Sequence, residues 1–175
     1  GDAITRDLYE GVEIHRPLLA DATDLLPLIV PEDVKRWPLP SQKYFAEVFM
    51  YNILSATKAV NLLVKTDKRD FDLIVSHDWL GSISGIMCKR MLQKPMVFHL
   101  HSVEEGRVGD GSVTIKNLER RAAALADTVV TVSYSMRDQL VSLGYEEWKI
   151  RVVYNGVDEK KQDVANVVQT EIKRV

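Results

Sequence analysis

The chain has 175 residues, 46% of them hydrophobic and 27% charged, which is typical of one globular domain or of one domain and a small part of another. With 23 Lys and Arg against 25 Asp and Glu, the net charge of −2 gives no support to nucleic-acid binding. The single Cys88 excludes an internal disulfide framework and a cysteine-rich zinc module. No apolar run approaches the roughly 20 residues that span a bilayer, and no secretory signal is visible, so the expected location is the cytoplasm.

The first 65 residues predict one short strand and one long helix, separated by an irregular segment. Residues 11–17 alternate in polarity and are rich in β-branched side chains, which predicts a strand. Prolines break regular structure over 18–40, apart from a short helix expected around 20–26. From Ser41 to about Lys65 the apolar side chains recur with helical spacing, so we predict a helix that Ser41 caps.

The rest of the chain alternates apolar strands with helices. The predicted strands are 71–79, 96–101, 128–133 and 149–155, and the predicted helices are 82–92, one from about Val113, and 135–143. This alternation predicts an α/β fold, a three-layer Rossmann-like open parallel sheet with helices on both faces. Short right-handed connections should place consecutive strands side by side or close together.

The polar stretch 159–175 has little apolar surface of its own. We expect it to be a linker or connecting helix toward a further domain, although a terminal helix docked on this domain fits the composition equally well. The chain opens on Gly1 rather than Met, which fits a tag remnant or a piece of a longer protein.

Polar and titratable residues follow each of the four predicted strands, and three of the four histidines are among them. They are Ser76, His77, Asp78 and Trp79; His99, His101, Ser102, Glu104, Glu105, Gly106 and Arg107; Ser133 and Tyr134; and Asn155, Gly156 and Asp158. In an open parallel sheet, ligands bind beyond the carboxyl ends of the strands. A binding or catalytic site at this edge is therefore the main functional prediction.

Two interpretations of Asp78 are open, because it stands where the first of these strands turns into a helix. Its carboxylate could cap that helix by accepting backbone N–H bonds. It could instead accept a bidentate pair of hydrogen bonds from adjacent hydroxyls of a sugar. Trp79, the next residue, is expected to pack inside the domain.

His99 and His101 are two residues apart on a strand, so their side chains share one face. They could be a metal-binding pair, completed by His77 and Asp78. Alternatively, His101 projects into a polar cleft and His99 supports the fold.

Three other features of the sequence do not indicate a binding or catalytic site. The Gly-rich segment 104–111 could hold an anion, but its spacing is neither that of a P-loop nor that of a dinucleotide fingerprint, so we expect a mobile surface loop. The Asn-Gly-Val-Asp segment 155–158 predicts a turn, which could equally serve as a hinge. Cys88 is expected to pack within its helix.

Four segments occur in a distinctive order and spacing, namely DLIVSHDWLGSISG, PMVFHLHSVEEGR, LERRAAALADTVVTVSYSMRDQL and KIRVVYNGVD. Together they resemble the N-terminal domain of GT-B glycosyltransferases of the glycogen/starch synthase and glycosyltransferase-family-1 type. The resemblance covers residues 70–158 well and the flanking parts more loosely. It implies that residues 1–158 are the acceptor-side domain, without the family's first strand and Gly-rich loop, and that 159–175 lead toward a C-terminal donor-binding domain.

The resemblance also implies roles for individual residues. His101 would be the catalytic residue, touching the donor sugar near its reacting carbon, and His77 and Asp78 would bind substrate on the acceptor side. The other expected substrate-binding residues are Glu105 and Arg107 in a loop over the cleft, Ser133 beside the sugar site, and Asn155 at the start of the interdomain linker.

The implied activity is transfer of a sugar from a nucleotide-sugar donor, such as UDP- or ADP-glucose, to a glucan or other hydroxyl acceptor with retained anomeric configuration. No cofactor or metal is expected, because positive side chains of the C-terminal domain would neutralise the diphosphate, and this stretch alone is expected to be inactive. Two alternatives are a metal-dependent hydrolase using His77, Asp78, His99 and His101, and a non-catalytic α/β sugar- or nucleotide-binding module. A related sugar-phosphate synthase would share the same fold.

Overall fold

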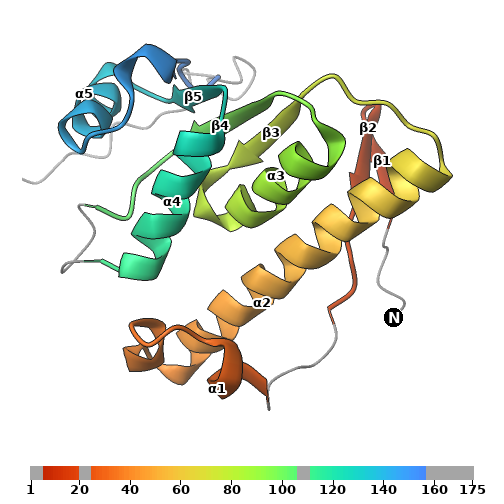
Figure 1. The fold of residues 1–175 in the computed structure, drawn as a ribbon, viewed down its shortest axis with the longest axis horizontal. Helices are drawn as coiled ribbons and strands as arrows, with labels where there is room; N and C mark the ends of the chain where they lie inside the picture. Colours follow the sequence, from red (N-terminus) through yellow and green to blue (C-terminus); the bar gives the residue numbers. More distant parts are fainter. Residues whose placement is uncertain (1–5, 20–24, 106–110, 157–175) are drawn as a thin grey trace, which may run out of the picture.

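The computed structural model describes residues 6–19, 25–105 and 111–156; most of the helix predicted at 20–26 and the whole of the connector 159–175 lie outside them. The described part contains an antiparallel hairpin, a four-stranded parallel sheet and the helices around it (Figure 1). In chain order, its elements are β1 Arg6–Tyr9, β2 Val12–His15, α1 Leu26–Ile29, η2 Val34–Arg36, α2 Leu39–Thr57, η3 Lys58–Thr66, β3 Ile74–His77, α3 Asp78–Leu92, β4 Met96–Leu100, α4 Val113–Leu125, β5 Thr128–Thr131, α5 Tyr134–Ser142, η4 Glu147–Lys149 and β6 Ile150–Val152.

The parallel sheet has the strand order β3-β4-β5-β6, so consecutive strands are neighbours, as predicted. All four predicted strands and the three helices between them are confirmed, although each strand is shorter than its apolar run. His77, the last residue of β3, lies opposite His99, and Leu100 at the end of β4 lies opposite Thr131 at the end of β5. The carboxyl ends of these strands are therefore nearly level.

Helices α3, α4 and α5 pack against the same face of this sheet. Phe98 and Leu100 of β4 are fully buried there, in one cluster with Ala122 of α4 and Leu140 of α5. Each strand is followed in the sheet by the next strand of the chain, and the crossover connections between parallel strands are right-handed. All the connecting helices therefore lie on the same face of the sheet. The expected cover on both faces is thus seen on one face within the described residues, and Val75, on the opposite face, is 50% exposed.

Helix α2 begins at Leu39, two residues before the predicted start, and Ser41 is not its cap. Pro38 precedes the helix and Pro40 lies in its first turn, without any side-chain cap. Proline fixes a helical φ angle and has no N–H to satisfy, so a polar cap is less needed here. The helical path continues through the π-helical η3, which confirms the predicted span to about Lys65.

A buried amide joins α2 to α3, the helix that follows β3. Asn52, which is 1% exposed, donates from Nδ2 to the carbonyl oxygen of Leu80 at 2.6 Å. Its Oδ1 accepts a hydrogen bond from the backbone N–H of Ser84 at 2.9 Å. Because both ends of the amide are used across the interface, its burial is compensated, and α2 and α3 are held in one register.

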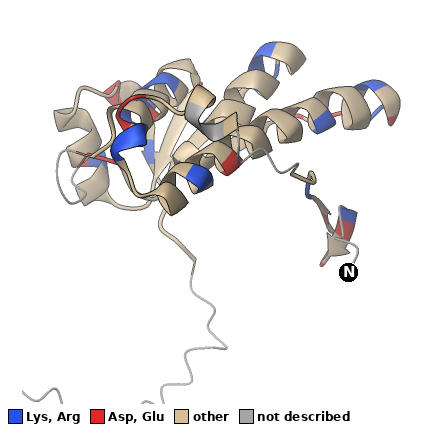
Figure 2. Cartoon of the chain, turned by 90° about the horizontal axis from the view of Figure 1, so that it is seen from below, with Lys and Arg blue, Asp and Glu red and all other residues tan. Residues whose placement is uncertain are grey.

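The hairpin β1–β2 contains the strand predicted at 11–17 and a strand that was not predicted. Glu10 and Gly11 at its turn have φ angles of 48° and 83°, the conformation that two-residue hairpins require. The hairpin projects from the other elements in Figure 2, which also shows acidic and basic residues interspersed along the helices. Within the described residues, no helix combines the length and apolarity needed to cross a bilayer.

The close approach of α3 to β3 yields a test of this packing. A methyl group at Gly85 would lie 2.6 Å from Cβ of Ser76, so we expect Gly85→Ala to lower the free energy of unfolding by about 1–2 kcal/mol in urea titrations. At Gly81 the nearest atom, Oγ of Ser76, would be 3.3 Å away, so Gly81→Ala should change stability by less than about 1 kcal/mol. Equal losses in both variants would contradict this account of the interface.

Candidate functional site

Three imidazole rings meet at the carboxyl edge of the parallel sheet. Nδ1 of His77 and Nε2 of His101 are 3.1 Å apart, within hydrogen-bond distance. The ring of His99 lies 5.0 Å from that of His77 and 4.2 Å from that of His101, centroid to centroid. We call His77, His99 and His101 the histidine cluster. The prediction that His77 and His101 lie together at one edge is confirmed.

The members of the histidine cluster differ in exposure. His77 and His101 are exposed, whereas His99 is half-buried. Burial of His99, and then the nearby His101 and His77, lower the pKa of the His99 imidazole below its ordinary 6.5. His99 is therefore neutral at pH 7, with one ring nitrogen free to accept a hydrogen bond or bind an ion.

Asp78 links the turn after β3 to the end of β4. Its Oδ1 accepts a hydrogen bond from the backbone N–H of His101 at 2.8 Å, and α3 has no side-chain cap, so the capping interpretation is wrong. The φ angle of Asp78 is 49°, in the left-handed region that non-glycine residues rarely occupy. Such strain persists where the surroundings impose it, often at functional sites.

The other residues predicted at this edge follow β5 and β6. Ser133 caps α5, because its Oγ accepts a hydrogen bond from the N–H of Met136 at 3.1 Å. The exposed Asn155 follows Tyr154, whose ring lies 6.2 Å from that of Tyr134 at the start of α5. Ser133 and Asn155 thus lie at the carboxyl ends of their strands, as predicted, but the Ser133 hydroxyl already holds a helix end.

Two residues were predicted in the loop after β4. The carboxylate of Glu105 forms an ion pair with Arg120 of α4 at 2.9 Å, and the Glu105 carbonyl accepts a hydrogen bond from Gln139 of α5. Glu105 is therefore held by the helical layer in this structure. Arg107 lies outside the described residues.

An aromatic groove that the sequence did not reveal adjoins the same edge. Its volume is about 400 Å³, and its lining includes Trp37, Tyr44, Trp79 and Glu104. Trp79, which directly follows Asp78, is 8% exposed and stacks on Phe45, so the prediction that it packs inside the domain is confirmed. Tyr44 is 52% exposed and provides the accessible ring of the groove.

Asp33 ties the segment that forms one wall of this groove to the start of α4. It accepts hydrogen bonds from the hydroxyls of Ser112, at 2.7 Å, and Thr114, at 2.6 Å, and from the Thr114 N–H. Burial acts to raise the pKa of Asp33, but these hydrogen bonds outweigh it and lower the pKa to about 2. Asp33 is thus a strongly held carboxylate between segments about 80 residues apart in sequence.

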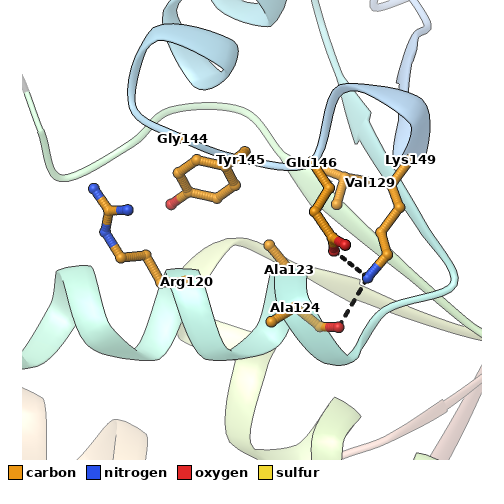
Figure 3. A pocket seen from close by; sticks show the side chains of 8 residues that line it. All are labelled: Arg120, Ala123, Ala124, Val129, Gly144, Tyr145, Glu146 and Lys149. Atoms are coloured by element: carbon orange, nitrogen blue, oxygen red, sulfur yellow. Dashed lines mark hydrogen bonds and ion pairs between the residues drawn. The ribbon is translucent and has the colours of Figure 1, made fainter.

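A second cavity, of about 90 Å³, lies near the opposite edge of the sheet (Figure 3). Lys149 reaches across it to form an ion pair with Glu146 and donates a hydrogen bond to the carbonyl of Ala124 at 2.9 Å. Ala124 is in the last turn of α4, where free carbonyls attract a cation. This cavity therefore surrounds a structural contact at the end of a helix.

The sequence has relatives among glycosyltransferases. Residues 15–161 match the sequence model of Glycosyltransferase Family 4. An uncharacterized glycosyltransferase of Methanocaldococcus jannaschii is 32% identical over 99 residues, which cover 54% of this chain and 25% of that protein. Alpha-maltose-1-phosphate synthase of Mycolicibacterium smegmatis is 30% identical over 94 residues, or 49% of this chain and 24% of that protein. Each match spans about a quarter of the relative's length.

The Asp33 contacts predict a pH-dependent stability. Asp33→Asn should lower the free energy of unfolding at pH 7 by roughly 1–2 kcal/mol, because three hydrogen bonds to a carboxylate are lost or weakened. The folded-state pKa lies below the ordinary 3.8, so this stabilisation is present above about pH 4 and is lost as pH falls to about 2. Urea titrations across that window should show a shallower decline in the variant. Glu32→Gln, which removes only an exposed ion pair with Lys35, is the control and should lower the free energy of unfolding at pH 7 by less than about 0.5 kcal/mol.

Proposed function

The chain belongs to Glycosyltransferase Family 4, and from that premise we propose that it forms the acceptor-side half of an enzyme that transfers a sugar from a nucleotide-sugar donor to a hydroxyl acceptor. The observation that carries this proposal is the meeting of His77, Asp78 and His101 at the carboxyl edge of the sheet. In open parallel sheets this edge is where ligands bind. Family membership favours a transferase over the metal-dependent hydrolase that the same residues suggested.

The proposed reaction moves one glycosyl group between two oxygen atoms. The bond between the sugar's anomeric carbon and the diphosphate oxygen breaks, and a bond from that carbon to the acceptor oxygen forms. The acceptor hydroxyl loses its proton, and the diphosphate leaves with the bonding electrons. Positive charge develops on the sugar ring during this step, so neutral or negative groups placed beside it assist the reaction.

His101 is proposed to contact the donor sugar near its anomeric carbon. Nε2 of His101 faces His77, so Nδ1 is the ring nitrogen left for a sugar hydroxyl. Asp78 acts as a positioning residue, because its carboxylate holds the backbone N–H of His101. Fixing the His101 backbone in this way reduces the entropy lost when the sugar binds.

The finer features of the enzyme are part of the same proposal. We propose that residues 1–158 form one domain, that 159–175 connect it to a donor-binding domain, and that the transfer retains anomeric configuration. The donor is proposed to be UDP- or ADP-glucose, and the acceptor a glucan or another polyol. Glu105, Arg107, Ser133 and Asn155 remain proposed substrate contacts.

The aromatic groove is proposed to hold part of the acceptor. Its exposed Tyr44 ring offers an apolar surface with a polar tip, and the groove includes the carboxylate-bearing Glu104. Such a mixture of aromatic surface and a few polar groups is typical of small-molecule sites. Because Trp79 and Glu104 closely follow Asp78 and His101 in sequence, an acceptor in the groove would approach the histidine cluster.

The role of His101 can be tested in the full-length enzyme. His101→Ala should lower kcat by about 100-fold or more and leave the KM for the acceptor within about threefold, because the contact strengthens in the transition state. The matched control is His15→Ala on β2, which should retain kcat within about twofold. Steady-state kinetics with a nucleotide-sugar donor measures both constants. An unchanged kcat for His101→Ala would refute this assignment.

The acceptor groove makes a separate kinetic prediction. Tyr44→Ala should raise the acceptor KM by about three- to tenfold, because the ring's contact with the acceptor is worth about 1 kcal/mol, and should leave kcat nearly unchanged. Tyr51, also on α2 and 39% exposed, does not line the groove, so Tyr51→Ala is the control. Equal acceptor KM values for the two variants would rule out Tyr44 as an acceptor contact.

A further inference from the structure

We propose that the histidine cluster is a binding site for a divalent transition-metal ion, with Zn²⁺ the best-fitting ion. His77, His99 and His101 each offer one ring nitrogen, and these three atoms lie within 4.8 Å of one another. Three imidazole ligands with open positions for solvent are a known zinc arrangement. The parallel register that sets His77 beside His99 brings ligands from two strands together without a dedicated loop.

The strongest support comes from a buried nitrogen. Nε2 of His99 is inaccessible to solvent and has no hydrogen-bond partner among the described residues. A buried polar atom without a partner costs roughly 1–3 kcal/mol, and such atoms in native proteins call for an explanation, such as a bound ion. An ion bound to Nε2 of His99 would satisfy this nitrogen.

The His77–His101 pair has a separation suited to an ion. Two nitrogen ligands of one tetrahedral Zn²⁺ are about 3.4 Å apart, given Zn–N bonds of about 2.0–2.1 Å. The observed separation of Nδ1 and Nε2 is 3.1 Å. In the metal-free pair one ring donates an N–H hydrogen bond to the other. That ring must carry its proton on its second nitrogen when the ion binds.

The three imidazole ligands determine which metal ions the site can bind. Imidazole nitrogen suits Zn²⁺, Ni²⁺ and Cu²⁺, whereas Mg²⁺ and Ca²⁺ require oxygen ligands. The nearby Asp78 carboxylate already accepts a hydrogen bond from the His101 N–H and is not part of the cluster. His77 and His101 are exposed, so water can complete the coordination.

A bound ion would take Nε2 of His101, on the same ring whose Nδ1 is proposed above to contact the donor sugar. The ion would add positive charge beside a sugar that itself becomes positive in the transition state, so Zn²⁺ would inhibit the transferase reversibly. This consequence rests on the proposed function, whereas the metal site itself rests on the geometry of the cluster alone.

The test is direct titration of the chain, free of any histidine tag, with Zn²⁺ by calorimetry. We expect one ion per chain, and a dissociation constant at least about tenfold weaker in His99→Gln. His15→Gln replaces the one histidine outside the cluster and should bind Zn²⁺ within about twofold of the unmodified chain. Co²⁺ should bind with the visible absorption of a low-coordinate nitrogen-ligated ion, and Mg²⁺ should not compete.

Three results would overturn the proposal. The unmodified chain would bind no Zn²⁺, His99→Gln would bind Zn²⁺ with unchanged affinity, or His15→Gln would lose as much Zn²⁺ affinity as His99→Gln. Circular dichroism checks the fold of each variant. If His99→Gln unfolds, His77→Gln at an exposed position replaces it, and the same tenfold loss is expected. Because ion binding is the readout, a failure here leaves the transferase assignment intact, and an inactive transferase leaves the metal site intact.

Discussion

The parallel pairing of β3 with β4 is the constraint on which the chemistry of this chain depends. Its register places His77 directly opposite His99, and the two-residue period of β4 carries His101 to the same face. Helices α3, α4 and α5 cover the other face, so the imidazoles lie on the side that these helices leave open. A shift of one residue in β4 would turn His99 into the hydrophobic core and remove Phe98 from it, so the core and the site enforce the same register.

A second link holds the edge of the sheet in place. The Asp78 carboxylate binds the His101 N–H, while the backbone of Asp78 itself has a positive φ angle. A conformation of this kind costs of order 1–3 kcal/mol. The packing of the buried Trp79 and the hydrogen bonds from Asn52 to the first turns of α3, just after Asp78, can sustain this cost. The strained backbone at Asp78 thus lowers local stability while it positions His101. Such a local loss of stability is typical of functional sites.

The sequence predicted most of the parallel sheet, because strand and helix periods are local signals. It also predicted that His77 and His101 would meet, because the ends of parallel strands converge whatever their exact lengths. The hairpin partner β1 was missed, since its turn uses Glu10 before Gly11 rather than the usual Asn or Asp. The Asp33 contacts and the aromatic groove were also missed, because they join segments far apart in sequence, and no local pattern marks such contacts. The resemblance to glycosyltransferases is confirmed by the family match.

The one-sided cover of the sheet has a practical consequence. Val75 is half exposed on β3, an edge strand of the sheet, and Val97 beside it is only partly buried. Among the described residues no strand pairs with this edge of β3. An exposed apolar edge of this kind invites a second molecule to add its own strand or to stack against it. The isolated chain should therefore aggregate and precipitate in concentrated solution. Low protein concentration or mild detergent should slow this aggregation.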